Sequence, residues 1–188
     1  MLSKLIDCVF RAYDWLFIRY YGLWRNDAKA ENAILFHLIR YSGKEIALPD
    51  GTKIAPGDEL IAIHVNRAYT ELLQARACGR AHAGIQLRDD FRDSLRALAK
   101  RMHSFPKYRN VRALTGETIL GAEAKHFGFI TVQLEGFHER LARRNARVLI
   151  SQTRNAGNIQ GSTISLRSRR VSKIWMSREQ LLRKYLKP

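Results

Sequence analysis

Short apolar runs that alternate with one helix-like segment constrain the fold of this chain most. Three runs, at 34–41, 59–65 and 129–134, are rich in Ile, Leu, Val and Phe and have the composition of strands. Residues 85–103 instead place apolar side chains three and four positions apart, which is the spacing of an amphipathic helix. This order predicts an α+β (mixed α/β) domain, with a mostly antiparallel central sheet and helices packed on it.

Turn residues divide the first part of this core. Asp50 and Gly51 form a two-residue turn, which predicts a hairpin over 46–54. With the strands on either side, we expect 34–65 to form an antiparallel meander. Asn66 is an expected N-cap for the helix that follows.

The second part of the core repeats the alternation. It predicts a strand at 111–117, then a short helix that Gly128 closes, then the strand at 129–134. Ser177 and Gln180 have the spacing of a capping box and predict a final helix that ends at Tyr185.

The length of 188 residues suits one domain. We divide it into an amphipathic N-terminal helix at 1–25, an α/β core at 34–135, and a basic segment of helix, strand and helix at 137–188. The two cysteines have no partner at zinc spacing and form no disulfide framework, so a reducing, cytoplasmic location is expected. No apolar stretch reaches the roughly 18–20 residues of a spanning helix.

Positive charge is concentrated near the C-terminus. Lys and Arg number 33 against 17 Asp and Glu, and residues 139–188 hold thirteen of these basic residues and two of the acidic ones. Such a segment favours an anionic membrane surface, an anionic polymer or, as an alternative, nucleic acid. A solvated basic face without a dedicated partner is the other interpretation. The expected anion-binding residues are Arg140, Arg143, Arg144, Arg147, Arg167, Arg169 and Arg170.

Aromatic side chains crowd the N-terminal helix, which reads RAYDWLFIRYYGLWR over 11–25. An interfacial helix places such rings at the level of the lipid headgroups, and Trp15, Tyr21 and Trp24 are the expected membrane contacts. The alternative is that the helix covers the sheet of its own domain, and both can hold.

Two histidines, His37 and His64, lie on neighbouring predicted strands. A strand histidine among apolar residues is often a hydrogen-bonded core residue, but His64 could also serve as a general base. Neither has a second ligand at metal spacing, so no metal site is predicted. No nucleophile elbow, phosphate-binding P-loop or zinc-protease motif occurs.

The residues Arg76, Gly79, Arg80 and Ala81 match the pattern R/Q-x-x-G-x-G/A, which is similar to the phosphate loop of GNAT acyltransferases. In that family the loop follows a strand and opens a helix, and its backbone N–H groups bind the pyrophosphate of acyl-CoA. The sequence AKHFGF at 124–129 also resembles the end of that fold. Two features depart from it. A helical segment precedes the loop, and His126 or Phe127 replaces the expected tyrosine. The alternative is a helix end with a glycine C-cap.

A second resemblance covers most of the chain. It rests on RYSGK at 40–44, PDGTKIAPGDELIAIHVN at 49–66, TGETILGAEAKHFGF at 115–129 and IWMSREQLLRKY at 174–185. These segments resemble the YkoP-like family, a small bacterial domain found alone and attached to polysaccharide deacetylases. Members often carry a second histidine between Val65 and Asn66, which this chain lacks. The resemblance implies a role in cell-envelope glycan or lipid metabolism and transfers no catalytic residue.

Together these features predict a cytoplasmic protein that is peripheral at the inner membrane. If it is an enzyme, we expect acyl or group transfer from a phosphorylated donor, with acyl-CoA as the candidate cofactor. The alternatives are a non-enzymatic basic module on nucleic acid and an accessory subunit of a membrane enzyme.

Overall fold

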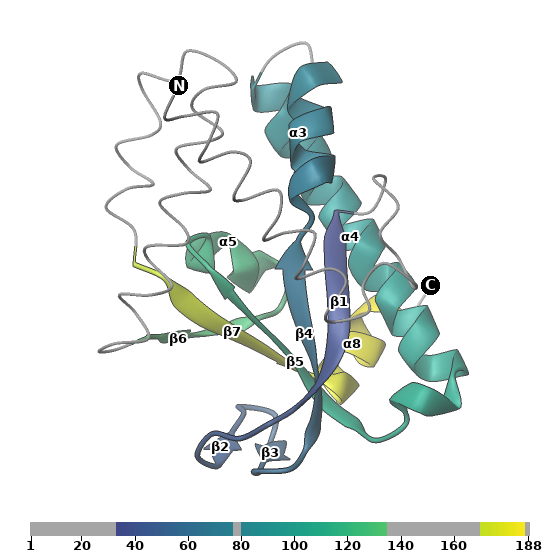
Figure 1. Ribbon diagram of the computed structural model, residues 1–188, viewed down its shortest axis with the longest axis vertical. Coiled ribbons are helices and arrows are strands. Elements are labelled where there is room, and N and C mark those ends of the chain that lie inside the picture. The colour runs from purple at the N-terminus through teal and green to yellow at the C-terminus, as the bar shows by residue number, and fades with distance from the viewer. Residues whose placement is uncertain (1–32, 77–79, 135–169, 187–188) are drawn as a thin grey trace, which may run out of the picture.

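A five-stranded mixed sheet organises the protein (Figure 1). The structure is a computed structural model, which describes residues 33–76, 80–134 and 170–186. In spatial order the strands are β1 (Ile34–Arg40), β4 (Glu59–Val65), β5 (Val111–Thr118), β7 (Ser172–Ser177) and β6 (Ile130–Gln133). Only β4 and β5 are parallel, and the other neighbours in this sheet are antiparallel, so the predicted mostly antiparallel sheet is confirmed.

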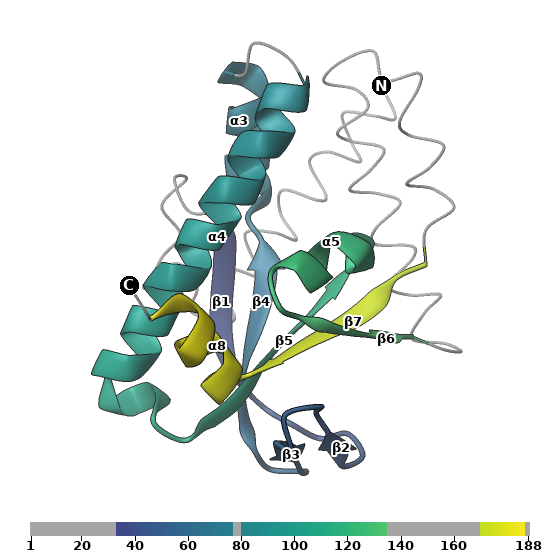
Figure 2. The ribbon, with the colours of Figure 1, turned by 180° about the vertical axis from the view of Figure 1, so that it is seen from behind.

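Helices cover one face of the sheet (Figure 2). They are α4 (Arg80–Ser104), α5 (Gly121–His126) and α8 (Arg178–Tyr185). Leu95, Leu98 and Met102 of α4 are buried in a core that also contains Leu114 of β5 and Met176 of β7. Burying an apolar side chain of this size contributes about 1.5–3 kcal/mol, so this stripe fixes how α4 lies on the sheet.

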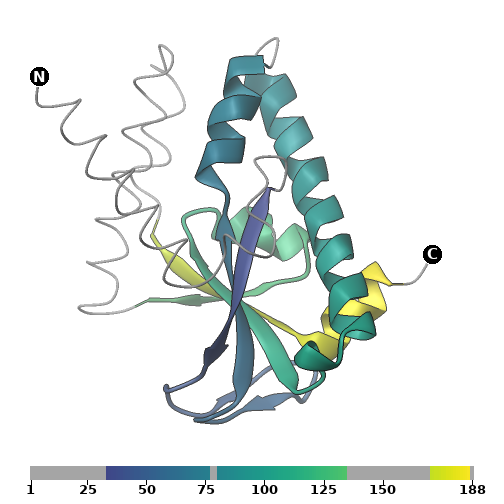
Figure 3. The ribbon, with the colours of Figure 1, turned by 45° about the vertical axis from the view of Figure 1, so that its right-hand side comes forward.

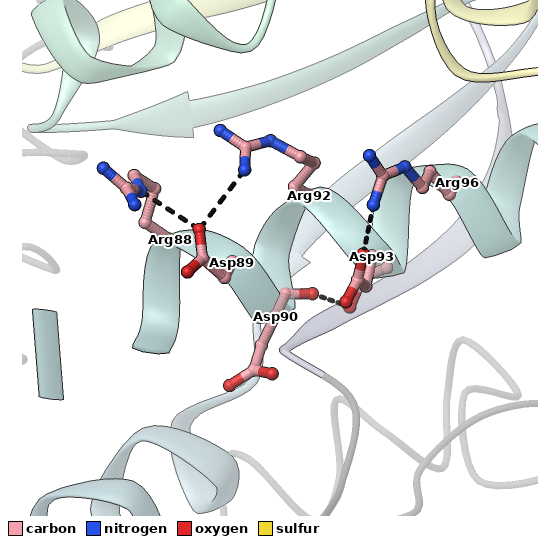
Figure 4. A network of polar contacts seen from close by, with 7 residues as sticks. Arg88, Asp89, Asp90, Arg92, Asp93 and Arg96 are labelled. Atoms are coloured by element: carbon pink, nitrogen blue, oxygen red, sulfur yellow. Dashed lines mark hydrogen bonds and ion pairs between the residues drawn. The ribbon is translucent and has the colours of Figure 1, made fainter. Parts of the chain in front are cut away.

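The outer face of α4 is polar and carries ion pairs along the helix (Figure 4). Asp89 contacts Arg88 at 3.2 Å and Arg92 at 3.3 Å, and Asp93 contacts Arg96 at 2.7 Å. These side chains are solvent-exposed, so each pair contributes at most about 1 kcal/mol. They make one side of the helix soluble while the apolar stripe holds the other.

A hairpin packs against the opposite face of the sheet. It consists of β2 (Ile46–Ala47) and β3 (Lys53–Ile54), joined at Gly51, whose φ of +87° suits the predicted turn. Its buried Leu48 and Ile54 pack on Trp175. The hairpin lies at the lower end of the sheet in Figure 1.

The predicted meander over 34–65 is wrong in its pairing. β1 pairs directly with β4, from Ile34 opposite Val65 to Arg40 opposite Glu59, and the hairpin forms a separate two-stranded sheet. Backbone bonds close the base of this excursion: Tyr41 N–H donates to Asp58 O and Gly57 N–H donates to Tyr41 O. The apolar side of the hairpin is buried against Trp175 rather than aligned with β1 or β4.

Helix α3 (Arg67–Arg76) directly follows β4. Tyr69 N–H lies 3.4 Å from Asn66 Oδ1, so the predicted N-cap is confirmed. The chain then turns back into α4, which begins at Arg80 and is longer than the predicted 85–103. Figure 3 shows α3 and the first part of α4 side by side above the sheet, with the rest of α4 running down beside the sheet. The two helices form the crossover that makes β4 and β5 parallel.

The last helix is capped as its sequence predicts. Gln180 N–H donates to Ser177 Oγ at 2.9 Å, and the helix ends at Tyr185. The Gln180 side chain donates to Gly128 O instead of completing the capping box, and this bond connects α8 to the turn after α5. Gly128 has a φ of +96°, as expected of a residue that closes a helix.

Several predicted elements lie outside the described residues. They are the aromatic helix at 1–25, the C-cap at Gly79 and the basic helix that begins the 137–188 segment. Among the helices that the structure does describe, none combines the length and the apolar character needed to cross a bilayer.

Candidate functional site

Polar side chains interrupt the hairpin-bearing face of the sheet. His37, Ala62, Thr115 and Trp175 occupy one cross-sheet row, because each is the register partner of the next on β1, β4, β5 and β7. His64 is two residues beyond Ala62 and therefore points to the same face. We call His37, His64 and Thr115 the histidine cluster.

The two imidazoles of the histidine cluster stack. Their ring centroids are 5.2 Å apart and the ring planes differ by 5°. Burial lowers the pKa of His37, and burial together with the neighbouring charge of His37 lowers the pKa of His64 to about 4. Burial thus favours the neutral form of both rings.

The parallel strands separate where the cluster lies. The pairing of β4 with β5 ends at Ala62 opposite Thr115. Beyond this point β4 still pairs with β1 and β5 still pairs with β7, so the two halves of the sheet diverge (Figures 1 and 3). Gly116 lies at the fork, where an added Cβ would be 2.9 Å from Ile63 O. His64 lies two residues beyond Ala62, the last residue of β4 that pairs with β5.

Thr115 and Lys173 add further polar groups to the same face of the sheet. Thr115 is 4% exposed, and its Oγ1 has no hydrogen-bond partner among the residues that the structure describes. Lys173 is the register partner of Glu117, and its Nζ lies 4.8 Å from the ring centre of Trp175. This cation–π contact holds an ammonium group above the buried tryptophan. The face thus offers neutral imidazoles, a hydroxyl and a cation.

Sequence reasoning identified the two histidines as site candidates but not Thr115 or Lys173. A threonine in the strand 111–117 is ordinary by composition. Its place beside the histidines depends on the parallel register of β4 with β5, which no local pattern encodes. No local signal distinguishes it, because the strand VRALTGET also contains Arg112, Glu117 and Thr118.

The predicted donor-binding residues lie away from the sheet. Arg76 ends α3, Arg80 and Ala81 begin α4, and Gly79 lies outside the described residues. Helix α3 separates this turn from β4, so the turn does not directly follow a strand as the GNAT-like pattern implies. The assignment of a donor site there stays a prediction.

The predicted anion and membrane contacts fall mostly outside the described residues. This holds for Arg140, Arg143, Arg144, Arg147, Arg167 and Arg169, and for Trp15, Tyr21 and Trp24. Arg170 is described and exposed just before β7, and its guanidinium donates to Gln133 Oε1 at 3.2 Å. In the described ranges, no group of three His, Cys, Asp or Glu side chains is arranged to hold a metal ion.

Comparison with known proteins identifies the family. The model of the YkoP domain matches residues 3–185, which is nearly the whole chain. The chain belongs to the YkoP domain family. Searches of curated proteins and of solved structures each found no match. The match spans the histidine cluster, the hairpin and most of the basic segment at 137–188.

Proposed function

We propose that the protein transfers an acyl or similar group from a phosphorylated donor, in cell-envelope glycan or lipid metabolism at a membrane surface. The observation that carries this proposal is the position of His64. A neutral imidazole lies where two parallel strands separate and directly before the first turn of α3. In its neutral form an imidazole can take the proton from an attacking hydroxyl or amine.

The reaction would be an acyl transfer. An oxygen or nitrogen of the acceptor attacks the thioester carbonyl carbon, and His64 takes the proton that this atom loses. The carbon–sulfur bond then breaks, and the CoA thiolate leaves with the proton that His64 had accepted, which returns the imidazole to its neutral form. Lys173 on the same face would attract the negative charge that develops on the carbonyl oxygen.

The predicted donor turn is compatible with this site. Helix α3 has ten residues, so its far end is about 15 Å from the end of β4. Acyl-CoA carries its pyrophosphate and its thioester at opposite ends of an extended arm. Phosphates near Arg76 and Arg80 and a thioester near His64 could therefore belong to one donor.

Two variants test the transfer. We expect calorimetry to detect acetyl-CoA binding, and Arg80→Glu to weaken it about tenfold or more, because a charge-assisted contact contributes about 1.5–3 kcal/mol. With glucosamine as the acceptor, His64→Gln should slow CoA release by about 10²- to 10⁴-fold, as loss of a general base does. His103→Gln, on the exposed end of α4, is the matched control.

Absence of acetyl-CoA binding would contradict the transferase proposal, and so would an Arg80→Glu variant that binds as tightly as the wild type.

Membrane association is tested separately. We expect the full-length protein to sediment with phosphatidylglycerol vesicles, and the double variant Trp15→Ala, Trp24→Ala to remain largely in the supernatant, because interfacial rings anchor such helices. A variant that lacks residues 1–25 should lose sedimentation entirely. If the full-length protein does not sediment with anionic vesicles, this role is excluded.

The net charge of +16 favours a second candidate, a basic module on nucleic acid. Filter binding across a salt series distinguishes the two, because nucleic-acid affinity falls steeply as counterions compete. A steep slope together with no vesicle binding would favour this candidate over the first.

A further inference from the structure

A second polar site lies at the opposite end of the sheet. A cavity of about 570 Å³ opens where β1 ends, β4 and β5 begin, and β7 passes into α8. Four arginines line it: Arg40, Arg109, Arg112 and Arg178. His64 is five residues along β4 from Glu59 in this cavity, or about 17 Å, so the two sites are distinct.

A β-bulge places one of these arginines. Glu59 is the partner of Val111, but the next residue, Leu60, is the partner of Ala113, so Arg112 is the extra residue between them. Such bulges redirect a side chain and are frequent beside functional sites. Arg112 is exposed and lines the cavity, so the bulge in β5 places a guanidinium group at the cavity.

The guanidinium groups of the cavity have no carboxylate partners among the described residues. The ion pairs that join two described residues all lie on α4. Arg178 is held by one bond, from its Nη2 to Met102 O at 3.2 Å, while its buried Nε has no acceptor among the described residues. Buried or clustered guanidinium groups without carboxylate partners favour binding of an anion with several oxygens.

Acceptors lie beside these donors. Asp58, Glu59 and Glu179 also line the cavity, and the Asp58 carboxylate accepts a bond from Ala55 N–H at 2.7 Å that fixes its turn. Together with Asn110, these carboxylates can accept hydrogen bonds from hydroxyl groups. Carboxylates next to the arginines would repel a ligand that is anionic throughout, so the charge should be confined to one end of it.

We propose that this cavity binds a small phosphorylated polyol, such as a sugar phosphate or glycerol phosphate. The guanidinium groups of Arg109, Arg112 and Arg178 contact the phosphate, and the carboxylates of Glu59 and Glu179 accept bonds from hydroxyl groups. The proposal does not depend on acyl transfer at the histidine cluster, since no residue is shared between the two sites.

The test uses the full-length protein and isothermal calorimetry with glucose 6-phosphate and glycerol 3-phosphate. We expect saturable binding of at least one of them, with glucose and inorganic phosphate each binding at least about tenfold more weakly. Arg112→Gln should weaken binding about 10- to 100-fold, as loss of a charge-assisted contact does. Arg96→Gln, an exposed arginine on α4, is the matched control and should change nothing.

Three results would overturn the proposal. The first is no saturable binding of either phosphate ester at millimolar concentration. The second is equally tight binding of inorganic phosphate or of glucose. Equal binding of phosphate would show that the carboxylates do not recognise hydroxyl groups, and equal binding of glucose would show that the arginines do not recognise the phosphate. The third is unchanged affinity in both Arg112→Gln and Arg109→Gln. Because both arginines are exposed, these variants should fold normally, and circular dichroism checks this. Acetyl-CoA binding is measured in the same variants, so failure here is separable from failure of the transferase proposal.

Discussion

Replacing Trp175 with alanine is expected to lower the free energy of unfolding by about 3–5 kcal/mol, which is the cost of removing a large aromatic side chain from a packed core. Trp175 is 1% exposed and joins the hairpin to the sheet, because Leu48 and Ile54 pack on it. Its ring also makes an edge contact with Tyr41, with centroids 5.8 Å apart. Urea denaturation followed by circular dichroism measures the change.

An exposed aromatic residue supplies the control for this prediction. Phe105 is 57% exposed, and Phe105→Ala should change stability by no more than about 0.5 kcal/mol. If Trp175→Ala were as mild as this control, the hairpin would not be packed on the sheet as described. Trp175→Phe should fall between the two, because it keeps part of the buried ring.

Acidification is expected to destabilise the protein through His64. Its pKa is lowered from 6.5 to about 4 in the folded state, so between these values the unfolded chain binds a proton that the folded protein does not. Stability from this group is complete above pH 6.5 and is lost as the pH falls toward 4. The loss is at most about 3 kcal/mol.

The contribution of His64 is isolated by comparing variants. His64→Gln should reduce the drop in unfolding free energy between pH 7 and pH 4.5 by roughly 2–3 kcal/mol. His103→Gln, which changes an exposed histidine, should leave the drop as it is in the wild type. Carboxylates titrate in the same range, but they are common to all three proteins. An unchanged drop in His64→Gln would show that its imidazole is not buried in the folded state.

The local elements were predictable because their signals are local. The stripe that includes Leu95 and Leu98 identified α4, and the spacing of Ser177 and Gln180 identified the start of α8. Caps, turns and amphipathic stripes depend on backbone geometry within a few residues. The same holds for Gly51, whose turn closes the hairpin.

Strand pairing was harder to predict from the sequence. The expected meander paired strands that are consecutive in the chain. In the structure, the Ile46–Ile54 hairpin instead forms a separate two-stranded sheet whose apolar side is buried on Trp175. β7 lies between β5 and β6 although it is the last strand that the structure describes. Such choices depend on how much apolar surface each arrangement buries across the whole domain.

The candidate sites show the same division. The sequence by itself determined that His37 and His64 occupy strands, that the chain carries a net charge of +16, and which segments resemble the family. Only the tertiary structure decided that these imidazoles stack at the fork beside Thr115, and that a bulge brings Arg112 to a cavity shared with Arg40 and Arg178. The reason is that residue type and local spacing are written along the chain, whereas proximity across strands is set by long-range pairing and by the packing that stabilises it.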